Sequence, residues 1–262
     1  RKDPPQGLVK MKAPQSPNTL IIQPEGGLAN RIHLIISFAV YARALNKKLQ
    51  VIWSKDNNTH LHVADGHFLE GFKQLPSCEF ISAAPDYPIT FKGCLTKNKD
   101  AYPSDFKKIN KEHGTDFLKF YRFLIPTAQV KKNLDNLVRE RGPFNAIHLR
   151  KTDFCNFLKK TGEIEIPERE FESFIERRPD LPCYIATDNR ETQHKFEAQY
   201  PETVFFYRKI NNAPTGLRHT TLFHAIVDLF MCCDAVEFKK SHPHSTFSTL
   251  IERIRSVACK KK

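Results

Sequence analysis

The chain has 262 residues, of which 40% are hydrophobic, so it can bury a substantial core as one large domain or two modest ones. Its 41 lysines and arginines exceed its 29 aspartates and glutamates, and the formal net charge of +12 favours a phosphorylated or polyanionic partner over an apolar one. The longest apolar run, 32–42, is interrupted by His33 and Ser37 and predicts a buried helix. It is too short for the roughly 20 residues that span a bilayer, so no membrane span is expected.

The seven cysteines include the adjacent pair Cys232-Cys233 inside an apolar segment, and none forms a C-x-x-C motif. An odd count with this spacing suggests neither a disulfide framework nor a zinc site. Buried thiols in a reducing compartment such as the cytoplasm are slightly favoured over the lumen of the Golgi or endoplasmic reticulum. The chain begins at Arg1 rather than Met, which leaves open the removal of an upstream anchor or signal.

The first half is predicted to begin with an irregular, proline-rich arm at 1–18 and then to alternate between strand and helix. The predicted elements are a strand at 19–23, a turn at 24–27, a helix at 28–45 and a strand at 49–53. From 57 to 113 the pattern weakens to loops and small elements, such as a short strand at 79–81. An acceptor could be recognised in this region.

The second half alternates more regularly. A predicted helix at 127–139 ends at Arg141-Gly142-Pro143, which we take as the joint between an N-terminal domain, 19–142, and a C-terminal domain, 143–262. The predicted strands are 145–149, 183–186, 203–207 and 235–238, and the helices that follow them are 168–176, 191–199, 220–231 and 247–257. A polar loop is expected between the first of these strands and its helix. Such alternation indicates parallel sheets covered by helices, which bind ligands at the carboxyl ends of their strands.

A glycine turn joins the first strand to the first helix. Gly26 and Gly27 let backbone N–H groups and the helix N-terminus come close to an anion. The turn lacks the later glycine of a dinucleotide fingerprint and the Lys-Ser/Thr of a P-loop, so by itself it is more typical of a tight turn. Asn30 and Arg31 are polar where the apolar helix begins, and they are the reason to keep the turn as a candidate binding site.

The segment His148-Leu149-Arg150-Lys151-Thr152-Asp153 directly follows an apolar strand, so an imidazole and two cations lie at the carboxyl end of that strand. Arg150 can hold a pyrophosphate with two N–H donors, in charge-assisted bonds roughly twice as strong as neutral ones. His148 could hydrogen-bond a base or a phosphate, and Asp153 could orient Arg150 or accept a proton. A surface salt bridge between Arg150 and Asp153 is the structural alternative. We favour the functional interpretation because position and chemistry both suit a ligand.

Two further polar segments follow later strands. In 186–189, Asp188 is expected first to cap the next helix and second to bind a hydroxyl of a nucleotide. The turn 241–248 can cap the last helix or hold phosphate oxygens at its N-terminus. The candidate residues there are Ser245, Thr246, Phe247 and Ser248. His242 and His244 lack a third ligand at a suitable spacing, so no metal site is expected.

Taken in order, these motifs resemble the fucosyltransferase superfamily of GT-B glycosyltransferases, which includes the α-1,2-, α-1,6- and protein O-fucosyltransferases. The resemblance covers most of the chain. The segments that carry it are Gly26–Arg31, His148–Asp153, Tyr184–Asp188 and His224–Ser248, the last with Asp228 and Ser245-Thr246-Phe247-Ser248. The second and fourth motifs together are fairly specific.

The resemblance implies an α/β fold of two Rossmann-like halves whose parallel sheets face a central cleft. It also implies a GDP-sugar donor bound mainly to the second half, no separate cofactor, and a metal-independent inverting transfer to a glycan or glycoprotein acceptor. By this resemblance Arg150 contacts the β-phosphate, His148 lies near the guanine and Asp228 reads the base. The turn from Ser245 to Ser248 binds phosphate, and Asn30 lines the cleft.

The chain departs from the family pattern in three ways. Lys151 stands where members usually carry a second arginine, and a lysine offers a point charge in place of a fork. Asp228 precedes Asp234 by six residues, a closer spacing than the family's. The chain is also short. A UDP-sugar such as UDP-xylose is therefore the alternative donor.

The expected chemistry is a single displacement in which a carboxylate deprotonates the acceptor hydroxyl and Arg150 stabilises the departing diphosphate. Asp153 is the first candidate for the base, followed by Glu163, Glu165 and Glu25. A nucleic-acid-binding protein is the alternative from another class, and it ranks lower because the lysines are dispersed and no recognition motif is present. A catalytically silent sugar-binding homologue is a third hypothesis.

Overall fold

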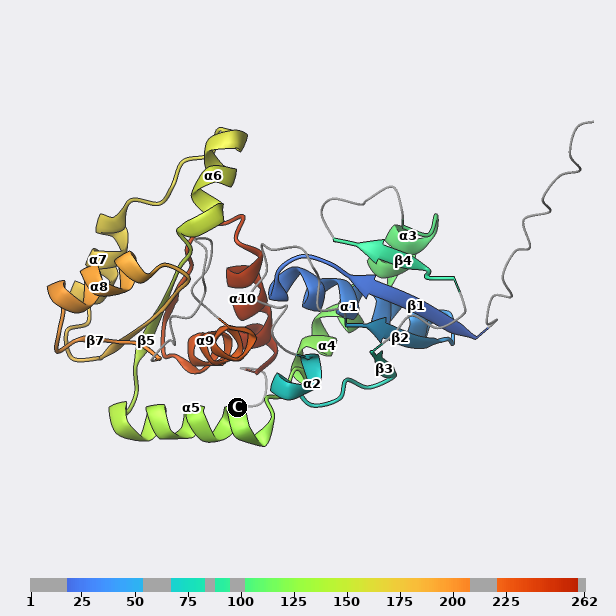
Figure 1. Cartoon of the computed structure of the whole chain (residues 1–262), viewed down its shortest axis with the longest axis horizontal. Coiled ribbons are helices and arrows are strands. Elements are labelled where there is room, and N and C mark those ends of the chain that lie inside the picture. The colour runs from blue at the N-terminus through green and yellow to red at the C-terminus, as the bar shows by residue number, and fades with distance from the viewer. Residues whose placement is uncertain (1–17, 54–66, 83–87, 95–101, 208–220, 259–262) are drawn as a thin grey trace, which may run out of the picture.

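The chain folds around two four-stranded parallel sheets, one in each half (Figure 1). The computed structural model describes residues 18–53, 67–82, 88–94, 102–207 and 221–258. The first sheet has the order β3-β2-β1-β4 and consists of β1 (Thr19–Pro24), β2 (Lys48–Ile52), β3 (Cys78–Ile81) and β4 (Phe91–Gly93). The second has the order β7-β6-β5-β8 and consists of β5 (Asn145–Leu149), β6 (Cys183–Thr187), β7 (Val204–Phe205) and β8 (Phe238–Lys239). All the strand pairings are parallel, which confirms the predicted α/β class.

Helix α1 (Leu28–Ala44) is buried over most of its length, as the apolar run 32–42 predicted. It packs on β1 and β2 and is covered by α3 (Phe106–Glu112), α4 (Gly114–Phe120) and α10 (Thr246–Ala258). Burial on all sides requires that its polar groups find partners. The Ser37 hydroxyl donates to the His33 carbonyl oxygen at 2.8 Å, and Arg31 Nε donates to the Gly26 carbonyl oxygen at 2.8 Å.

The remaining helices of the described chain are α2 (Phe68–Gly71), the 3₁₀ helix η3 (Tyr121–Phe123), α5 (Ala128–Arg141), α6 (Thr152–Thr161), α7 (Glu168–Glu176), α8 (Arg190–Gln199) and α9 (Leu222–Asp234). The prediction of a polar loop after β5 is wrong, because α6 occupies it. Phe154 and Leu158, one helical turn apart, are buried, and Gly162 ends the helix with a φ of +71°. The region 57–113, where loops and small elements were expected, contains α2, β3, β4 and α3. It lies partly outside the described residues, as does nearly all of the arm 1–18.

The last strand is shorter than predicted. It begins at Phe238 rather than Ala235, because the preceding backbone has other partners. Val236 N–H donates to the Phe144 carbonyl oxygen at 2.8 Å. Arg255 on α10 donates to the carbonyl oxygens of Cys232, Cys233, Ala235 and Val236, at 2.6 to 3.1 Å. The guanidinium therefore satisfies carbonyl groups that the end of α9 leaves without helical partners.

The two halves share one hydrophobic core, which includes Leu20 and Ile32 from the first half and Ile226 and Leu250 from the second. Helix α10 packs on α1, and α2 packs on α9 so closely that a Cβ on Gly71 would lie 2.0 Å from Ile226 Cδ1. Helix α5, which the boundary at 142/143 assigns to the N-terminal domain, packs against α9 and lies below the second sheet in Figure 1. The halves are therefore joined by packing as well as by the chain.

Candidate functional site

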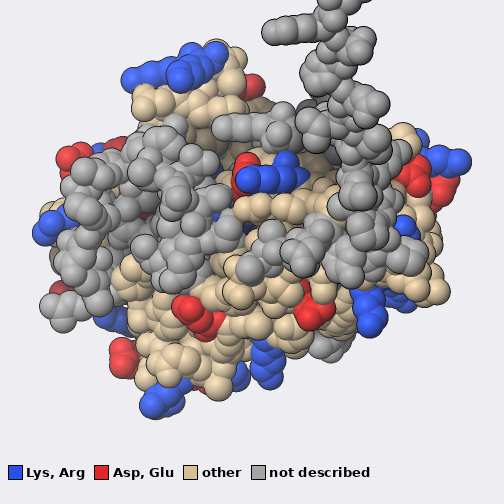
Figure 2. Space-filling model, turned by 45° about the vertical axis from the view of Figure 1, so that its right-hand side comes forward, with Lys and Arg blue, Asp and Glu red and all other residues tan. Residues whose placement is uncertain are grey.

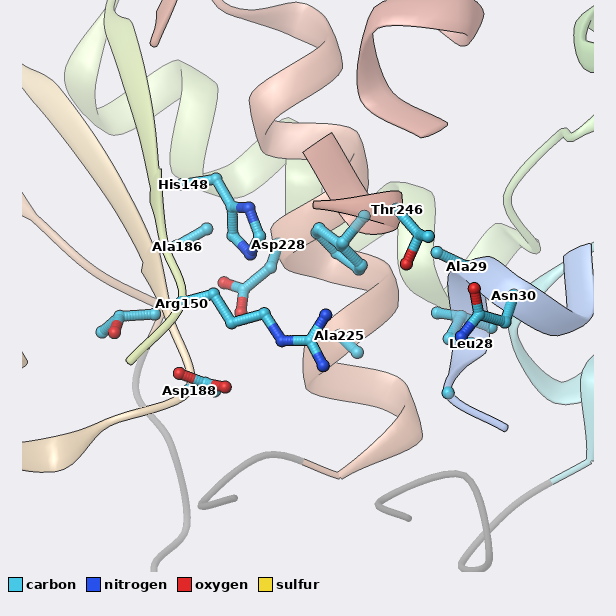
Figure 3. Close-up of a pocket in the computed structure, with 13 residues that line it drawn as sticks. Leu28, Ala29, Asn30, His148, Arg150, Ala186, Asp188, Ala225, Asp228 and Thr246 are labelled. Atoms are coloured by element: carbon cyan, nitrogen blue, oxygen red, sulfur yellow. The ribbon is translucent and has the colours of Figure 1, made fainter. Parts of the chain in front are cut away.

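A pocket lies between the halves, where the carboxyl ends of β5 and β6 meet the N-termini of α1 and α10 and one face of α9 (Figure 3). About 570 Å³ in and around it is free of atoms, and this space is continuous with solvent. The lining residues are Gly27, Leu28, Ala29, Asn30, His148, Arg150, Ala186, Thr187, Asp188, Ala225, Asp228, Thr246 and Phe247. Eight of the candidates taken from the sequence lie in this set: Gly27, Asn30, His148, Arg150, Asp188, Asp228, Thr246 and Phe247.

Arg150 reaches from the end of β5 into the pocket, toward the side formed by α1 (Figure 3). Its guanidinium carbon lies 5.1 Å from the centre of the Phe154 ring, so the first turn of α6 supports one face of the cation. Lys151 turns elsewhere and pairs with Glu165 and, at 3.3 Å, with Glu168. Burial lowers the pKa of Lys151, but the two carboxylates outweigh it and the net shift is upward. The cation beside Arg150 therefore braces α7 and does not line the pocket.

His148 is held from behind by the last helix. Its Nδ1 lies 2.9 Å from the hydroxyl of Ser248, and its ring centre lies 4.8 Å from that of Phe247. The Ser248 hydroxyl also accepts the N–H of Ser241 at 3.3 Å and is buried. Ser248 was expected to bind phosphate, but it lies outside the pocket lining and contacts His148 instead.

The N-terminus of α10 forms one wall of the pocket through Thr246 and Phe247. The hydroxyl of Ser245 accepts the backbone N–H of Ser248 at 3.3 Å, so this buried serine caps the helix and does not face the pocket. The first N–H groups of a helix lack intrahelical partners and carry partial positive charge. The wall therefore suits an anionic group such as a phosphate.

Two carboxylates line the pocket. Asp228 on α9 is buried and accepts a hydrogen bond of 2.5 Å from the hydroxyl of Tyr184 on β6. Burial, together with this carboxylate, raises the pKa of Tyr184 well above its ordinary value, which keeps the phenol a donor. Asp188 accepts the backbone N–H of Lys151 at 3.0 Å and ties the end of β6 to that of β5.

The prediction that Asp188 caps the next helix is wrong. The cap of α8 is Asn189, whose side-chain oxygen accepts the N–H of Thr192 at 2.7 Å. Asp188 instead lines the pocket, where its other expected role is to bind a hydroxyl of a nucleotide.

The glycine turn contributes to the opposite wall. Gly26 has a φ of +94°, a conformation that favours glycine, and Gly27 is the N-cap of α1. Asn30 lines the pocket, and its buried Oδ1 has no hydrogen-bond partner among the described residues. Arg31 does not line the pocket: it is fully buried, and its guanidinium lies 5.0 Å from the ring of Trp53 as well as bonding to the turn. Gly26 also lies outside the lining.

Three of the four candidate bases, Glu163, Glu165 and Glu25, do not line the pocket. Glu163 is exposed and lies 3.2 Å from His244 Nε2, Glu165 pairs with Lys151, and Glu25 lies 4.0 Å from Lys92. The side chain of Asp153, in the first turn of α6, lies outside the described part of the chain. In the described part, no three His, Cys, Asp or Glu side chains are grouped as metal ligands would be, and no helix is long and apolar enough to cross a bilayer.

Known structures share this architecture across nearly the whole chain. The fucosyltransferase NodZ from Bradyrhizobium aligns with a TM-score of 0.55 and 11% identity, over 90% of this chain and 93% of its own. POFUT1 in complex with GDP-fucose aligns with a TM-score of 0.57 and 12% identity, over 94% of this chain and 97% of its own. No protein-family model and no curated protein sequence matches the chain. The chain therefore has the GT-B fold that these fucosyltransferases share, which confirms the predicted fold class.

Proposed function

We propose that this protein is a glycosyltransferase that transfers L-fucose from GDP-fucose to a glycan or protein acceptor. The observation that carries the proposal is the convergence of Arg150 and the N-terminus of α10 on one pocket between two parallel sheets. NodZ has been soaked with GDP-fucose, and POFUT1 has been crystallised in complex with GDP and with GDP-fucose, so proteins of this fold bind such donors.

In the proposed reaction the acceptor oxygen forms a bond to the anomeric carbon as the bond from that carbon to the β-phosphate oxygen breaks. The configuration inverts, and the acceptor proton passes to a carboxylate. Arg150 can bind two oxygens of the departing diphosphate with its fork of N–H groups, and the N-terminus of α10 adds partial positive charge. These groups stabilise charge that grows in the transition state, so the displacement we propose uses no metal.

We assign the base to Asp153, which follows Arg150 at the start of α6, because Glu163 is exposed and lies outside the pocket lining. Asp228 is assigned to the nucleotide base, because a buried carboxylate offers only acceptors and guanine presents N–H donors on its Watson–Crick edge. His148 would lie near the same base, and Asn30, Thr246 and Phe247 would line the donor. Asp188 would bind a ribose hydroxyl or would hold the ends of β5 and β6 together.

A ligand panel tests the proposal first. A ligand at 100 times its dissociation constant stabilises a protein by about 2.7 kcal/mol, so GDP and GDP-fucose should raise the melting temperature more than UDP and UDP-xylose. A larger rise in melting temperature with the UDP compounds would indicate a UDP-sugar donor instead. No shift with any of them would overturn it.

Arg150→Ala tests the phosphate contact. We expect a folded protein without measurable transfer, because the leaving group loses its principal cation. The matched control is Arg169→Ala, on the exposed outer side of α7, which should transfer as the unaltered protein does. Substantial turnover in Arg150→Ala would contradict the assignment. Binding of GDP-fucose by the unaltered protein without transfer or donor hydrolysis would indicate the silent homologue.

The nucleic-acid alternative ranks lower. On the face shown in Figure 2, the lysine and arginine side chains of the described residues are interspersed with acidic ones. This alternative would be favoured if the protein bound RNA or DNA with an affinity that falls steeply with salt and did not bind nucleotide sugars.

A further inference from the structure

A buried polar cluster links the two halves directly behind the pocket. It consists of His33 on α1, Tyr121 on η3, and Arg253 with the Thr246 carbonyl group on α10. Helices α1 and α10 lie side by side at the centre of the molecule (Figure 1). His33 is one helical turn beyond Asn30, which lines the pocket from the first half, and Thr246 lines it from the second. The cluster therefore joins the parts of the pocket wall that α1 and α10 contribute.

The hydrogen bonds of this cluster form an ordered relay. Arg253 Nη1 donates to the Tyr121 hydroxyl at 2.6 Å, and that hydroxyl lies 2.6 Å from His33 Nδ1. His33 Nε2 lies 3.2 Å from the Thr246 carbonyl oxygen. Because a carbonyl oxygen only accepts, the Nε2 atom carries the proton and Nδ1 accepts from the tyrosine. Arg253 Nη1 also lies 3.2 Å from His33 Nδ1, so this nitrogen can accept from both Tyr121 and Arg253.

Packing around these residues fixes the geometry of their hydrogen bonds. Tyr121 is fully buried and His33 nearly so, and the Arg253 guanidinium lies 5.4 Å from the Tyr121 ring and 5.0 Å from that of Phe117. Apolar contacts between α1 and α10 tolerate sliding of one helix along the other, whereas hydrogen bonds between buried groups require one distance and one angle. The relay can therefore set the register of α10 on α1.

We propose that His33, Tyr121 and Arg253 are positioning residues for the donor site, holding the first turn of α10 at a set distance from the first turn of α1. This inference rests on the proposed function, because it concerns how well that site receives the diphosphate. None of the three residues lines the pocket. Their effect passes through the Thr246 carbonyl group to the N-terminus of α10.

The test compares Tyr121→Phe with Tyr41→Phe. Both tyrosines are buried in the same core, but the Tyr41 hydroxyl donates to Asp105 at 2.7 Å, within the first half. Each change removes one hydroxyl and keeps the ring. Tyr121→Phe should raise the dissociation constant of GDP and the KM for GDP-fucose by about fivefold to tenfold, the effect of one buried hydrogen bond. The kcat at saturating donor should change by less than about twofold, because Arg150 is untouched.

Hydrogen exchange on the protein without nucleotide supplies a readout that does not depend on the proposed function. The N–H groups of Ser248 and Thr249, which donate to Ser245 in the first turn of α10, should exchange about tenfold faster in Tyr121→Phe than in Tyr41→Phe. Arg253→Met, which removes the donor to both Tyr121 and His33, should act in the same direction as Tyr121→Phe.

Unchanged exchange in the first turn of α10 in Tyr121→Phe, or an equal loss of GDP affinity in Tyr41→Phe, would overturn the inference. If the unaltered protein binds no GDP, the proposed function fails, and the exchange measurement alone decides whether the relay holds the two helices together.

Discussion

The buried histidine of the relay makes the stability of the fold depend on pH. Burial, the positive charge of Arg253 and, in the opposite sense, the bond to the Thr246 carbonyl group together lower the pKa of His33 from 6.5 to about 4. Between these values the unfolded chain binds a proton at this position that the folded chain does not. The free energy of unfolding therefore falls as the pH falls through this window. The full difference of about 2.5 pKa units corresponds to about 3 kcal/mol, of which about 2 kcal/mol is lost by about pH 5.

Urea unfolding of the unaltered protein and of His33→Gln, from about pH 7.5 to about pH 4, measures this contribution. The variant should be the less stable protein at neutral pH. Because glutamine does not titrate in this range, the difference in free energy of unfolding between the two proteins should shrink by about 2 kcal/mol at about pH 5. Subtracting one curve from the other removes the contribution of the other titrating groups. Parallel curves for the two proteins would refute the reasoning, because they would mean that His33 binds its proton equally well in both states.

Three substitutions test other contacts. Gly71→Ala places a Cβ against the fully buried Ile226 and should lower the free energy of unfolding by about 1–3 kcal/mol in chemical unfolding. Ile226→Val removes the clashing methyl, so the double variant should lose less stability than the two single variants together. Simple additivity would contradict this packing. Arg255→Met keeps the length of the side chain but leaves the carbonyl groups at the end of α9 unbonded, so the free energy of unfolding should fall by about 1–3 kcal/mol, and an unchanged melting temperature would argue against this cap. Ser248→Ala frees the His148 ring and should weaken GDP binding about threefold to tenfold in calorimetry, whereas unaltered affinity would mean that packing on Phe247 suffices to hold the ring.

Much of the fold could be predicted because its signals are local. Each buried parallel strand is a short apolar run, and the polar residues that follow it must lie at the carboxyl edge of the sheet. This reasoning placed Arg150 and His148 in the pocket, and the N-terminus of α10 follows from the capping serine at Ser245. Helix α6 was missed although its sequence carries a signal, an apolar pair one turn apart followed by a terminating glycine.

The roles of neighbouring residues were harder to separate, because residues of the same chemical type lie next to one another. Asp188 and Asn189 can both cap a helix, and only the backbone path shows that Asn189 does so. Among the serines of the last turn, Ser245 caps α10 and Ser248 supports His148. Arg31 carries a charge that suggested binding, yet it is enclosed with Trp53 and bonds to the turn before it.

The sequence by itself determined the two parallel sheets and the edges at which ligand-binding residues collect, since alternation of strand and helix and the spacing of apolar residues are properties of short segments. Only the tertiary structure decided how the halves meet. The bond from His33 to Thr246 joins residues 213 positions apart, and nothing near either residue indicates its partner. Such contacts depend on the angle and register at which α1 and α10 pack, and these are set by the whole core that the two halves share.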